Sequence, residues 1–282
     1  MSPRPAAVLD RFVSIYIPVV ITLVLLLFPF YWMAITSIKP NAELFDVKGN
    51  PFIVLQPTLD HYKYLFERTL FANWILNTTF VACLSTAISL ALSVPAGYAL
   101  ARFRFPGGTL LGWAIFVTYL VPQTLLFLPL AQVVNWLGLA NTLWSLVLTY
   151  PTFLVPFGSW LLIGYFRSIP KDLEESALVD GATRLQALIK IALPLAIPGI
   201  LSVGIFSFTL SWNEFIYALV FISDPTNKTV PVGVTSELIR GDVFFWGSLM
   251  AGALLGSVPV ALIYSFFVEY FVAGLTAGAV KG

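Results

Sequence analysis

The segment Pro170-Lys-Asp-Leu-Glu-Glu-Ser-Ala-Leu-Val-Asp-Gly-Ala-Thr-Arg-Leu-Gln-Ala-Leu-Ile-Lys-Ile-Ala-Leu-Pro-Leu-Ala-Ile-Pro198 is the longest charged, helix-capable part of the sequence between two hydrophobic regions. The rest of the chain is mostly apolar and is joined by short connections. This segment is therefore the part of the chain best suited to contact a water-soluble partner.

The order of residues in this segment predicts two short helices with a break between them. Pro170 suits a first helical turn, where its missing N–H costs nothing. Negative charge is favourable near a helix N-terminus, and the next residues include Asp172, Glu174 and Glu175. Gly181 can take the left-handed conformation that ends a helix. Thr183 can cap a second helix that runs to Pro194.

Seven positions of the segment resemble the cytoplasmic coupling loop of the membrane subunits of ABC importers. The family pattern is Glu-Ala-Ala, three residues, Gly, nine residues and Ile-x-Leu-Pro. This chain has Glu175-Ser176-Ala177, then Gly181, then Ile191-x-Leu193-Pro194, with Ser176 as the single departure. Asp180-Gly181-Ala182 and Pro198 further resemble the sugar-importer branch, similar to the second permease of maltose-type systems.

The resemblance implies that this loop docks into a cleft on an ATPase subunit. The residues it assigns to ATPase coupling are Leu173, Glu174, Glu175, Ser176, Ala177, Asp180, Gly181, Ala182 and Pro194. The alternative is a helix–Gly–helix loop that only connects two spans. A helix cap at Gly181 is compatible with either role.

The composition indicates a polytopic membrane protein. Of the 282 residues, 59% are hydrophobic and 10% are charged, whereas a soluble domain has about 25% charged residues. Six stretches are long enough to cross a bilayer as helices. They are 12–37, 74–100, 110–134, 143–165, 189–212 and 248–272. The first is too long for the core of a cleavable signal, so we expect it to be a span.

The Lys and Arg residues predict the orientation. With the N-terminus inside, the inner segments hold nine of the fifteen Lys and Arg residues and the outer segments hold six. The positive-inside rule then places both termini and the 166–188 loop in the cytoplasm. The segments 38–73 and 213–247 are expected outside. Each is either a solvated linker or, as the resemblance implies, a docking surface for an extracytoplasmic binding protein.

The spans hold few groups that could couple transport to ions. Ion-driven transporters usually carry titratable side chains in mid-span, and here Glu214 and Glu269 lie at span ends, where we expect them to reach the membrane surface. No phosphate loop, zinc motif or nucleophile elbow is present. We therefore expect no enzyme activity, no cofactor and no metal site, and the single Cys83 and single His61 are not expected to be functional.

Uncharged polar side chains in or beside the spans suit a hydroxyl-rich solute. The candidates for a substrate path are Asn77, Gln123, Trp212, Asn213 and Glu214. Trp212-Asn213-Glu214-Phe215 resembles a pattern of sugar-importer permeases. The alternatives are hydrogen bonding between helices for the polar residues and an interfacial anchor for the Trp212 motif.

These observations predict an all-α membrane protein with six spans and the type I ABC importer fold, in one transmembrane domain over 1–282. The resemblance implies a permease subunit of an ATP-driven, binding-protein-dependent importer of a sugar or oligosaccharide in a bacterial or archaeal cell membrane. Its partners would be two ATPase subunits, a second homologous permease, a solute-binding protein and the sugar, with no nucleic acid. The alternative is a secondary transporter or channel that works alone. The tail from Val272 to Gly282 resembles that of maltose-type permeases and would lie near the ATPase, or be a frayed end.

Overall fold

Long apolar helices dominate the chain in the computed structural model, which describes residues 12–276 and the side chains of 13–268. The helices longer than ten residues are α2 (Ile17–Ile38), α5 (Phe71–Arg102), α6 (Gly108–Tyr119), α7 (Gln123–Trp136), α9 (Pro151–Ser168), α12 (Leu193–Trp212) and α15 (Trp246–Thr276). The shorter helices are α3 (Asn41–Leu44), α4 (Asp60–Arg68), α8 (Leu143–Thr149), α10 (Asp172–Val179), α11 (Arg184–Ala187), α13 (Ile216–Phe221) and α14 (Val230–Leu238).

Short irregular turns and one hairpin complete the described residues. Phe12–Tyr16 and Leu188–Ala192 are π-helical, and Pro225–Asn227 form a 3₁₀ turn. The strands β1 (Ile239–Arg240) and β2 (Val243–Phe244) pair antiparallel, with Ile239 opposite Phe244. Gly241, in the two-residue loop, has a φ of 59°, which suits a tight hairpin turn.

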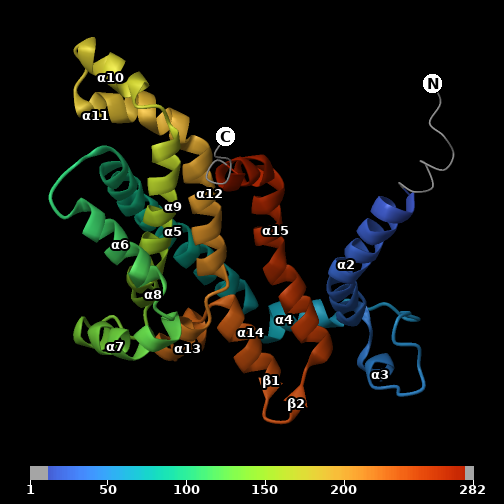
Figure 1. Cartoon of the computed structure of the whole chain (residues 1–282). Helices are drawn as coiled ribbons and strands as arrows, with labels where there is room; N and C mark the ends of the chain where they lie inside the picture. Colours follow the sequence, from blue (N-terminus) through green and yellow to red (C-terminus); the bar gives the residue numbers. More distant parts are fainter. Residues whose placement is uncertain (1–11, 277–282) are drawn as a thin grey trace, which may run out of the picture. The chain divides into compact units, whose positions relative to one another are not determined.

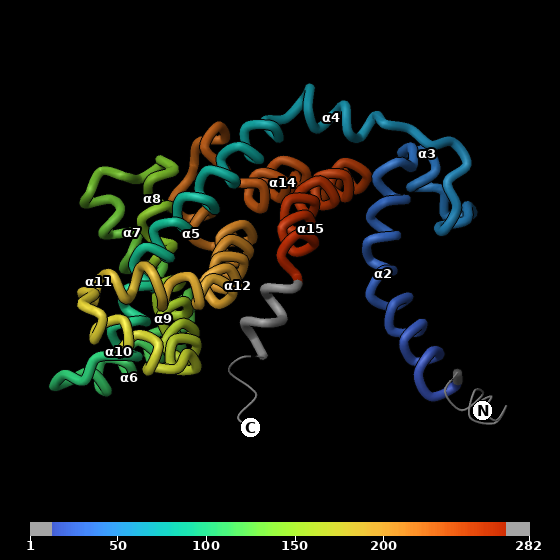
Figure 2. The backbone as a smooth tube through the Cα atoms, turned by 90° about the horizontal axis from the view of Figure 1, so that it is seen from above, coloured from blue at the N-terminus to red at the C-terminus, as the bar shows by residue number. Residues whose placement is uncertain are grey.

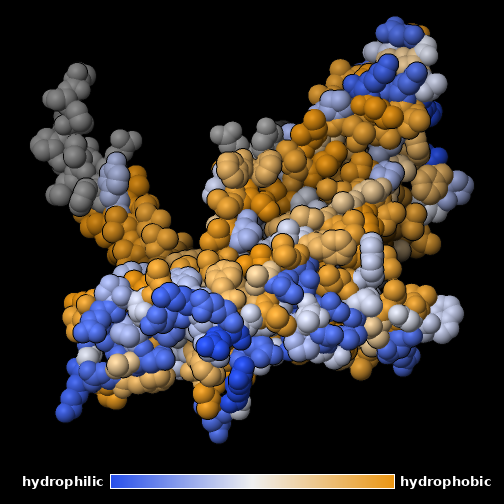
Figure 3. Space-filling model, turned by 180° about the vertical axis from the view of Figure 1, so that it is seen from behind, coloured by the Kyte–Doolittle hydropathy of each residue, from blue (hydrophilic) through white to orange (hydrophobic). Residues whose placement is uncertain are grey.

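Within residues 12–276, five helical segments are long and apolar enough to cross a membrane, and a sixth is present if α6 and α7 count as one span. The five are Val13–Ile38, Phe71–Arg102, Leu143–Ser168, Arg184–Trp212 and Trp246–Val268. Figure 3 shows hydrophobic side chains over the outside of the long helices, whereas hydrophilic side chains gather over α10 and α11. This distribution fits helices that face lipid.

The predicted span 110–134 differs from the structure, which has two helices there. The helices α6 and α7 meet at an angle of 97°. Pro122 is the N-cap of α7 and has a ψ of 126°, an extended conformation that cannot continue a helix. Pro129, in contrast, lies inside α7. One proline therefore breaks the segment while the other is accommodated.

The chain divides into two compact units, each with its own internal contacts. The first unit is Met1–Phe71 with Val234–Ser257, and the second is Ala72–Gly233 with Val258–Gly282. In the second unit, Figures 1 and 2 show α9 beside α12, with α10 and α11 at one end of this pair. Figure 1 shows α7, α8 and α13 toward the other end of α9.

Close packing between α5, α9 and α12 forms the core of the second unit. Leu162, Phe166 and Val203 are buried together in this core. A Cβ added at Gly97 of α5 would lie 2.7 Å from the Cβ of Leu162, so only glycine permits this approach of α5 and α9. Small residues such as this glycine allow spanning helices to pack closely.

Candidate functional site

Helix α10 begins where the sequence changes from apolar to acidic. Its N-cap is Lys171, and Asp172, Glu174 and Glu175 occupy its first turn, where their charge complements the helix dipole. Pro170 lies just before the cap, outside the first turn in which we had placed it. It still helps to start the helix because its own φ is fixed and it needs no hydrogen-bond acceptor.

Helix α10 ends in a Schellman motif at Gly181. The Ala182 N–H donates to the Ala177 carbonyl at 2.9 Å, and the Gly181 N–H donates to the Leu178 carbonyl at 3.1 Å. Gly181 has a φ of +89°, and a Cβ added to it would meet nothing within 4 Å. The predicted helix end is confirmed, and the glycine is required by the backbone conformation, not by crowding within the chain.

Thr183 starts the next helix with a full capping box. Its hydroxyl accepts from the Gln186 N–H, and the Gln186 side chain accepts from the Thr183 N–H at 2.8 Å. The capped end of α10 and the capped start of α11 are therefore joined by only a few residues. The two helices form a defined elbow, which we call the coupling elbow (residues 171–187).

The sequence predicted that the second helix ends at Pro194, but in the structure this helix continues past Pro194. It continues through the π-helical turn Leu188–Ala192 into α12, so that Arg184–Trp212 is one helical segment. Pro194 occupies the first turn of α12. Because a proline cannot donate a backbone hydrogen bond, the helix can continue through it when a π-helical turn precedes the proline.

Glu174 fixes the coupling elbow to the end of α5. Its Oε1 accepts from Arg102 Nε at 2.6 Å, and its Oε2 accepts from the Tyr98 hydroxyl at 2.7 Å. Arg102 also donates to the Ile169 carbonyl at 3.0 Å. The Arg102 and Glu174 side chains are 5% and 9% exposed. The sequence had placed Glu174 among surface residues, whereas the structure buries it.

The solvent-exposed surface of the elbow carries both apolar and polar side chains. Leu173, Val179 and Leu185 are 45%, 88% and 64% exposed. The other predicted coupling residues of the elbow are Glu175, Ser176, Asp180 and Gly181, which are exposed, and Ala177 and Ala182, which are partly exposed; Pro194, in α12, is also exposed. The exposed surface of the elbow is therefore part apolar and part polar.

The sequence profile described as "Binding-protein-dependent transport system inner membrane component" matches residues 93–277. The chain belongs to this family.

Relatives of this inner membrane component cover nearly the whole chain. A sulfoquinovosyl glycerol transport system permease protein of Agrobacterium fabrum is 39% identical, over 91% of this chain and 89% of the relative. A trehalose/maltose transport system permease protein of Thermococcus litoralis is 34% identical, over 98% of each chain. The predicted family is thereby confirmed.

The solved structures show the fold of this inner membrane component. A chain from the crystal structure of a bacterial ABC transporter that imports the acidic polysaccharide alginate has a TM-score of 0.79 at 24% identity, covering 93% of this chain and 97% of that one. A chain of an inward-facing methionine ABC transporter has a TM-score of 0.61 at 17% identity, covering 73% and 96%. These likenesses confirm the predicted type I importer fold.

Four of the five path candidates have partners inside the protein. The Asn77 amide donates to the carbonyls of Thr226 and Lys228, at 2.8 and 3.0 Å. Trp212 is 2% exposed and stacks on Phe208. The Asn77 hydrogen bonds hold the segment after α12, whereas the Trp212 stack lies within α12. The exposed Asn213 amide donates to the Thr209 carbonyl at 2.9 Å, and the Gln123 side chain is exposed.

Glu214, another of the path candidates, is buried within the protein, whereas we had expected its side chain to reach the membrane surface. Its carboxylate accepts from the N–H groups of Tyr217 and Ala218 at the start of α13, at 2.8 and 3.1 Å, and from the Tyr150 hydroxyl at 2.9 Å. Burial raises the pKa of this carboxyl, and the hydrogen bonds act in the opposite direction. The carboxylate thus joins α13 to the start of α9. The Glu269 side chain lies outside the described residues.

His61 belongs to the segment 38–73, which the sequence predicted to be a solvated linker or a docking surface, and its side chain is buried. It lies in α4 and is 7% exposed. No group of three or more metal-ligating side chains occurs among the described residues. Cys83 is a free, exposed thiol on α5.

Proposed function

We propose that this chain is the membrane-spanning permease subunit of an ATP-driven importer of a sugar or oligosaccharide, and that the coupling elbow is its contact with the ATPase. The observation that carries the proposal is the elbow itself. It combines two capped helices, an exposed surface that includes Leu173 and Val179, and one buried ion pair to a spanning helix.

The solute class rests on the relatives. Their names include sulfoquinovosyl glycerol, trehalose/maltose and diacetylchitobiose transport, all with carbohydrate groups. The absence of a motif for nucleotide binding or nucleophilic catalysis in the sequence agrees with a permease that leaves ATP hydrolysis to separate subunits. Its proposed partners are two ATPase subunits, a second homologous permease and an extracytoplasmic binding protein.

The proposed orientation follows from the Lys and Arg distribution and from counting spans. If α6 and α7 form one span, six spans put both termini on one side. The coupling elbow then lies on that same side, because it follows the fourth span. The positive-inside rule makes this side the cytoplasm, and the segments 38–73 and 213–247 face outward.

The elbow is proposed to move as one piece. The Schellman motif and the capping box fix α10 against α11, and the Arg102–Glu174 pair fixes α10 to α5. Displacement of α10 by closing ATPase subunits would therefore pull on α5 as well as on α12, which continues directly from α11. Two spans that move with the elbow can change which side of the membrane the path opens to.

The proposed path uses the candidates differently. Gln123 has an exposed polar side chain that is available to a hydroxylated solute, and the exposed Asn213 amide keeps hydrogen-bonding capacity beyond its bond to the Thr209 carbonyl. Asn77 and Glu214 hold the segment after α12 through their hydrogen bonds, and Trp212 packs on Phe208 within α12. The substitutions Gln123→Ala and Asn213→Ala should raise the KM for uptake, and Asn77→Ala should lower the melting temperature.

Two measurements test the proposal. The chain, extracted with its partner subunits in mild detergent, should co-purify with an ATPase. Vesicles that contain the complex should take up labelled sugar only when ATP is present on the side of the membrane that carries the ATPase subunits. Uptake by the isolated chain without ATP would overturn the proposal. The proposal would also be overturned if the second permease co-purified with the chain and no ATPase did.

A further inference from the structure

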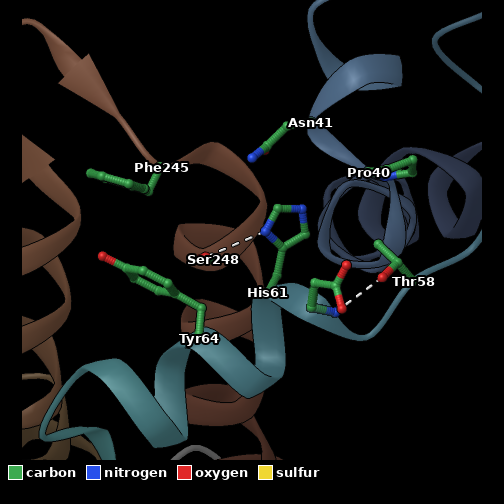
Figure 4. A pocket seen from close by; sticks show the side chains of 8 residues that line it. Pro40, Asn41, Thr58, His61, Tyr64, Phe245 and Ser248 are labelled. Atoms are coloured by element: carbon green, nitrogen blue, oxygen red, sulfur yellow. Dashed lines mark hydrogen bonds between the residues drawn. The ribbon is translucent and has the colours of Figure 1, made fainter.

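A pocket of about 260 Å³ lies within the first unit, away from the coupling elbow in sequence and unused by the function proposed above. It is formed where the loop after α2, the start of α4 and the start of α15 come together, and Figure 4 shows its lining side chains. Ligand pockets for drug-sized molecules are about 300–1,000 Å³. This pocket therefore suits a smaller ligand, about the size of one six-membered ring.

His61 forms a fixed wall of the pocket. Its Nε2–H donates to the Lys39 carbonyl at 2.9 Å, so its Nδ1 is the acceptor for the Ser248 hydroxyl at 3.4 Å. A Cβ added at Gly247 would lie 2.2 Å from the His61 ring, so glycine makes room for it. Because both ring nitrogens are engaged, His61 shapes the pocket and is not free to bind a metal.

Two aromatic rings form a second wall. Tyr64 and Phe245 are stacked with their centroids 5.6 Å apart and their planes at 15°, and Figure 4 shows them together on one side of His61. The face of an aromatic ring carries a partial negative charge, so it attracts the slightly positive C–H groups of a sugar ring. The stacked pair offers its ring edges and the ring faces not covered by the stack as an apolar part of the pocket lining, together with Pro40.

Neutral polar groups complete the pocket. Asn41 and Thr58 line it with an amide and a hydroxyl, and Figure 4 shows the Asn41 amide directed toward the space beside His61. Within the described residues the Asn41 amide forms no hydrogen bond, so it has two donors and an acceptor to offer a ligand. The one charged residue of the lining is Asp60, and no Lys or Arg is among the lining residues. The lining therefore disfavours anions and suits a neutral, hydroxylated ligand.

We propose that this pocket binds a single neutral sugar ring, as a surface site that holds one end of a glycan before it enters the membrane path. The ring would pack on the Tyr64–Phe245 pair, and its hydroxyls would bond to Asn41 and Asp60. The identity of the ligand rests on the proposed function, because only a sugar importer would meet such rings at this face. The site itself rests on the pocket.

The test measures binding by the full chain in lipid nanodiscs without any ATPase, so it does not depend on coupling. The probes are the methyl glycosides of glucose, galactose and mannose, with glycerol as an acyclic control, and the readout is saturation-transfer NMR. We expect at least one glycoside to bind with a Kd in the millimolar range and glycerol to bind far more weakly. Asn41→Ala and Phe245→Leu should each weaken binding about tenfold.

Asn135→Ala is the matched control, because Asn135 is an exposed amide on α7, outside the pocket. It should leave binding unchanged. Equal loss in this control, equal binding of glycerol, or no binding of any glycoside up to about 50 mM would overturn the proposal. Cross-linking of the solute-binding protein at position 41, with no glycoside bound, would also overturn it and make the pocket a docking contact. None of these outcomes affects the ATP-dependence that tests the proposed function.

Discussion

Arg102 and Glu174 form a buried ion pair between the end of α5 and the coupling elbow that follows α9. The Nε–Oε1 distance is 2.6 Å, and the Tyr98 hydroxyl bonds to the other carboxylate oxygen. Glu175, the neighbouring acid, is exposed. Two adjacent glutamates thus have different roles, one turned toward the protein and the other toward solvent.

The ion pair predicts that Glu174→Ala destabilises the protein and that Glu175→Ala does not. Removing Glu174 leaves the Arg102 charge buried without its partner, which costs about 3–5 kcal/mol. Thermal unfolding of the purified chain in detergent should show a clear drop in Tm for Glu174→Ala. Glu175→Ala removes the same charge from an exposed site, where the expected change is within about 0.5 kcal/mol.

Transport assays separate the two glutamates in a second way. In the assembled importer, Glu174→Gln should retain the Tyr98 hydrogen bond but loosen the connection to α5, so that ATP is hydrolysed with less sugar imported per ATP. An unchanged ratio of sugar to ATP in Glu174→Gln would show that the ion pair is not part of the coupling. Glu175→Ala is expected to reduce uptake mildly, because it removes a charge without blocking the approach of a partner.

Gly181 allows a test that separates backbone strain from docking. Gly181→Leu forces a branched residue to a φ of +89°, at a cost of about 1–3 kcal/mol, and also places a bulky side chain on the proposed docking surface. We expect normal membrane insertion and loss of ATP-dependent uptake. Gly181→Asn tolerates the left-handed backbone better and should keep part of the uptake.

Gly107 is the matched control for Gly181. It has a φ of +84°, and a Cβ added there would also meet nothing within 4 Å. Gly107→Leu therefore carries a similar strain outside the coupling elbow. If Gly107→Leu abolishes uptake as fully as Gly181→Leu, strain alone explains the loss and the docking role of Gly181 is wrong.

Local sequence signals predicted the elbow well because its geometry is set by neighbouring residues. The helix end at Gly181 and the cap at Thr183 each depend on a few adjacent positions, and both are present. The same local reasoning misplaced the end of the second helix at Pro194. It did not anticipate the π-helical turn before Pro194, which lets the helix continue into α12.

Contacts between distant residues could not be predicted from the sequence. Arg102 and Glu174 are 72 positions apart, and Asn77 is about 150 positions from the carbonyls that it binds. No spacing rule relates such residues, because their approach depends on how the spans pack. Glu174 and Glu214, which we expected at the surface, are therefore buried. The exposure of the elbow's apolar residues Val179 and Leu185 was not predicted from the sequence.

Glycines on α9 predict a position-specific effect of adding a methyl group. A Cβ at Gly158 would lie 2.8 Å from the Ser93 hydroxyl oxygen and 2.9 Å from a Val203 methyl group, whereas a Cβ at Gly164 would meet nothing within 4 Å. Gly158→Ala should therefore destabilise the protein by about 1–3 kcal/mol through overpacking. Gly164→Ala, on the same helix, should be neutral or slightly stabilising. Thermal unfolding of the two variants compares them directly, and equal Tm values would contradict the close packing at Gly158.

The environment of Glu214 predicts that stability depends on pH with a definite sign. Burial raises the pKa of the Glu214 carboxyl above its value in the unfolded chain, so the folded protein favours the protonated form. The contribution of this group to stability is therefore complete below the unfolded pKa and is lost as the pH rises through the folded pKa. The Tyr150 hydroxyl bonds to the ionised form and lowers the pKa of Glu214, in opposition to burial.

Tyr150→Phe should consequently raise the pKa of Glu214 further and move the loss of stability to higher pH. Unfolding measured from about pH 4 to about pH 8 should show this shift, together with a lower stability at the upper end. Tyr217→Phe is the control, because Tyr217 bonds to Glu214 through its backbone N–H, which the substitution keeps, while its hydroxyl donates to the Gln123 carbonyl at 3.4 Å. If both variants shift the pH dependence equally, the effect comes from general loosening around α13, and the Tyr150 hydroxyl has no specific role in holding the charge.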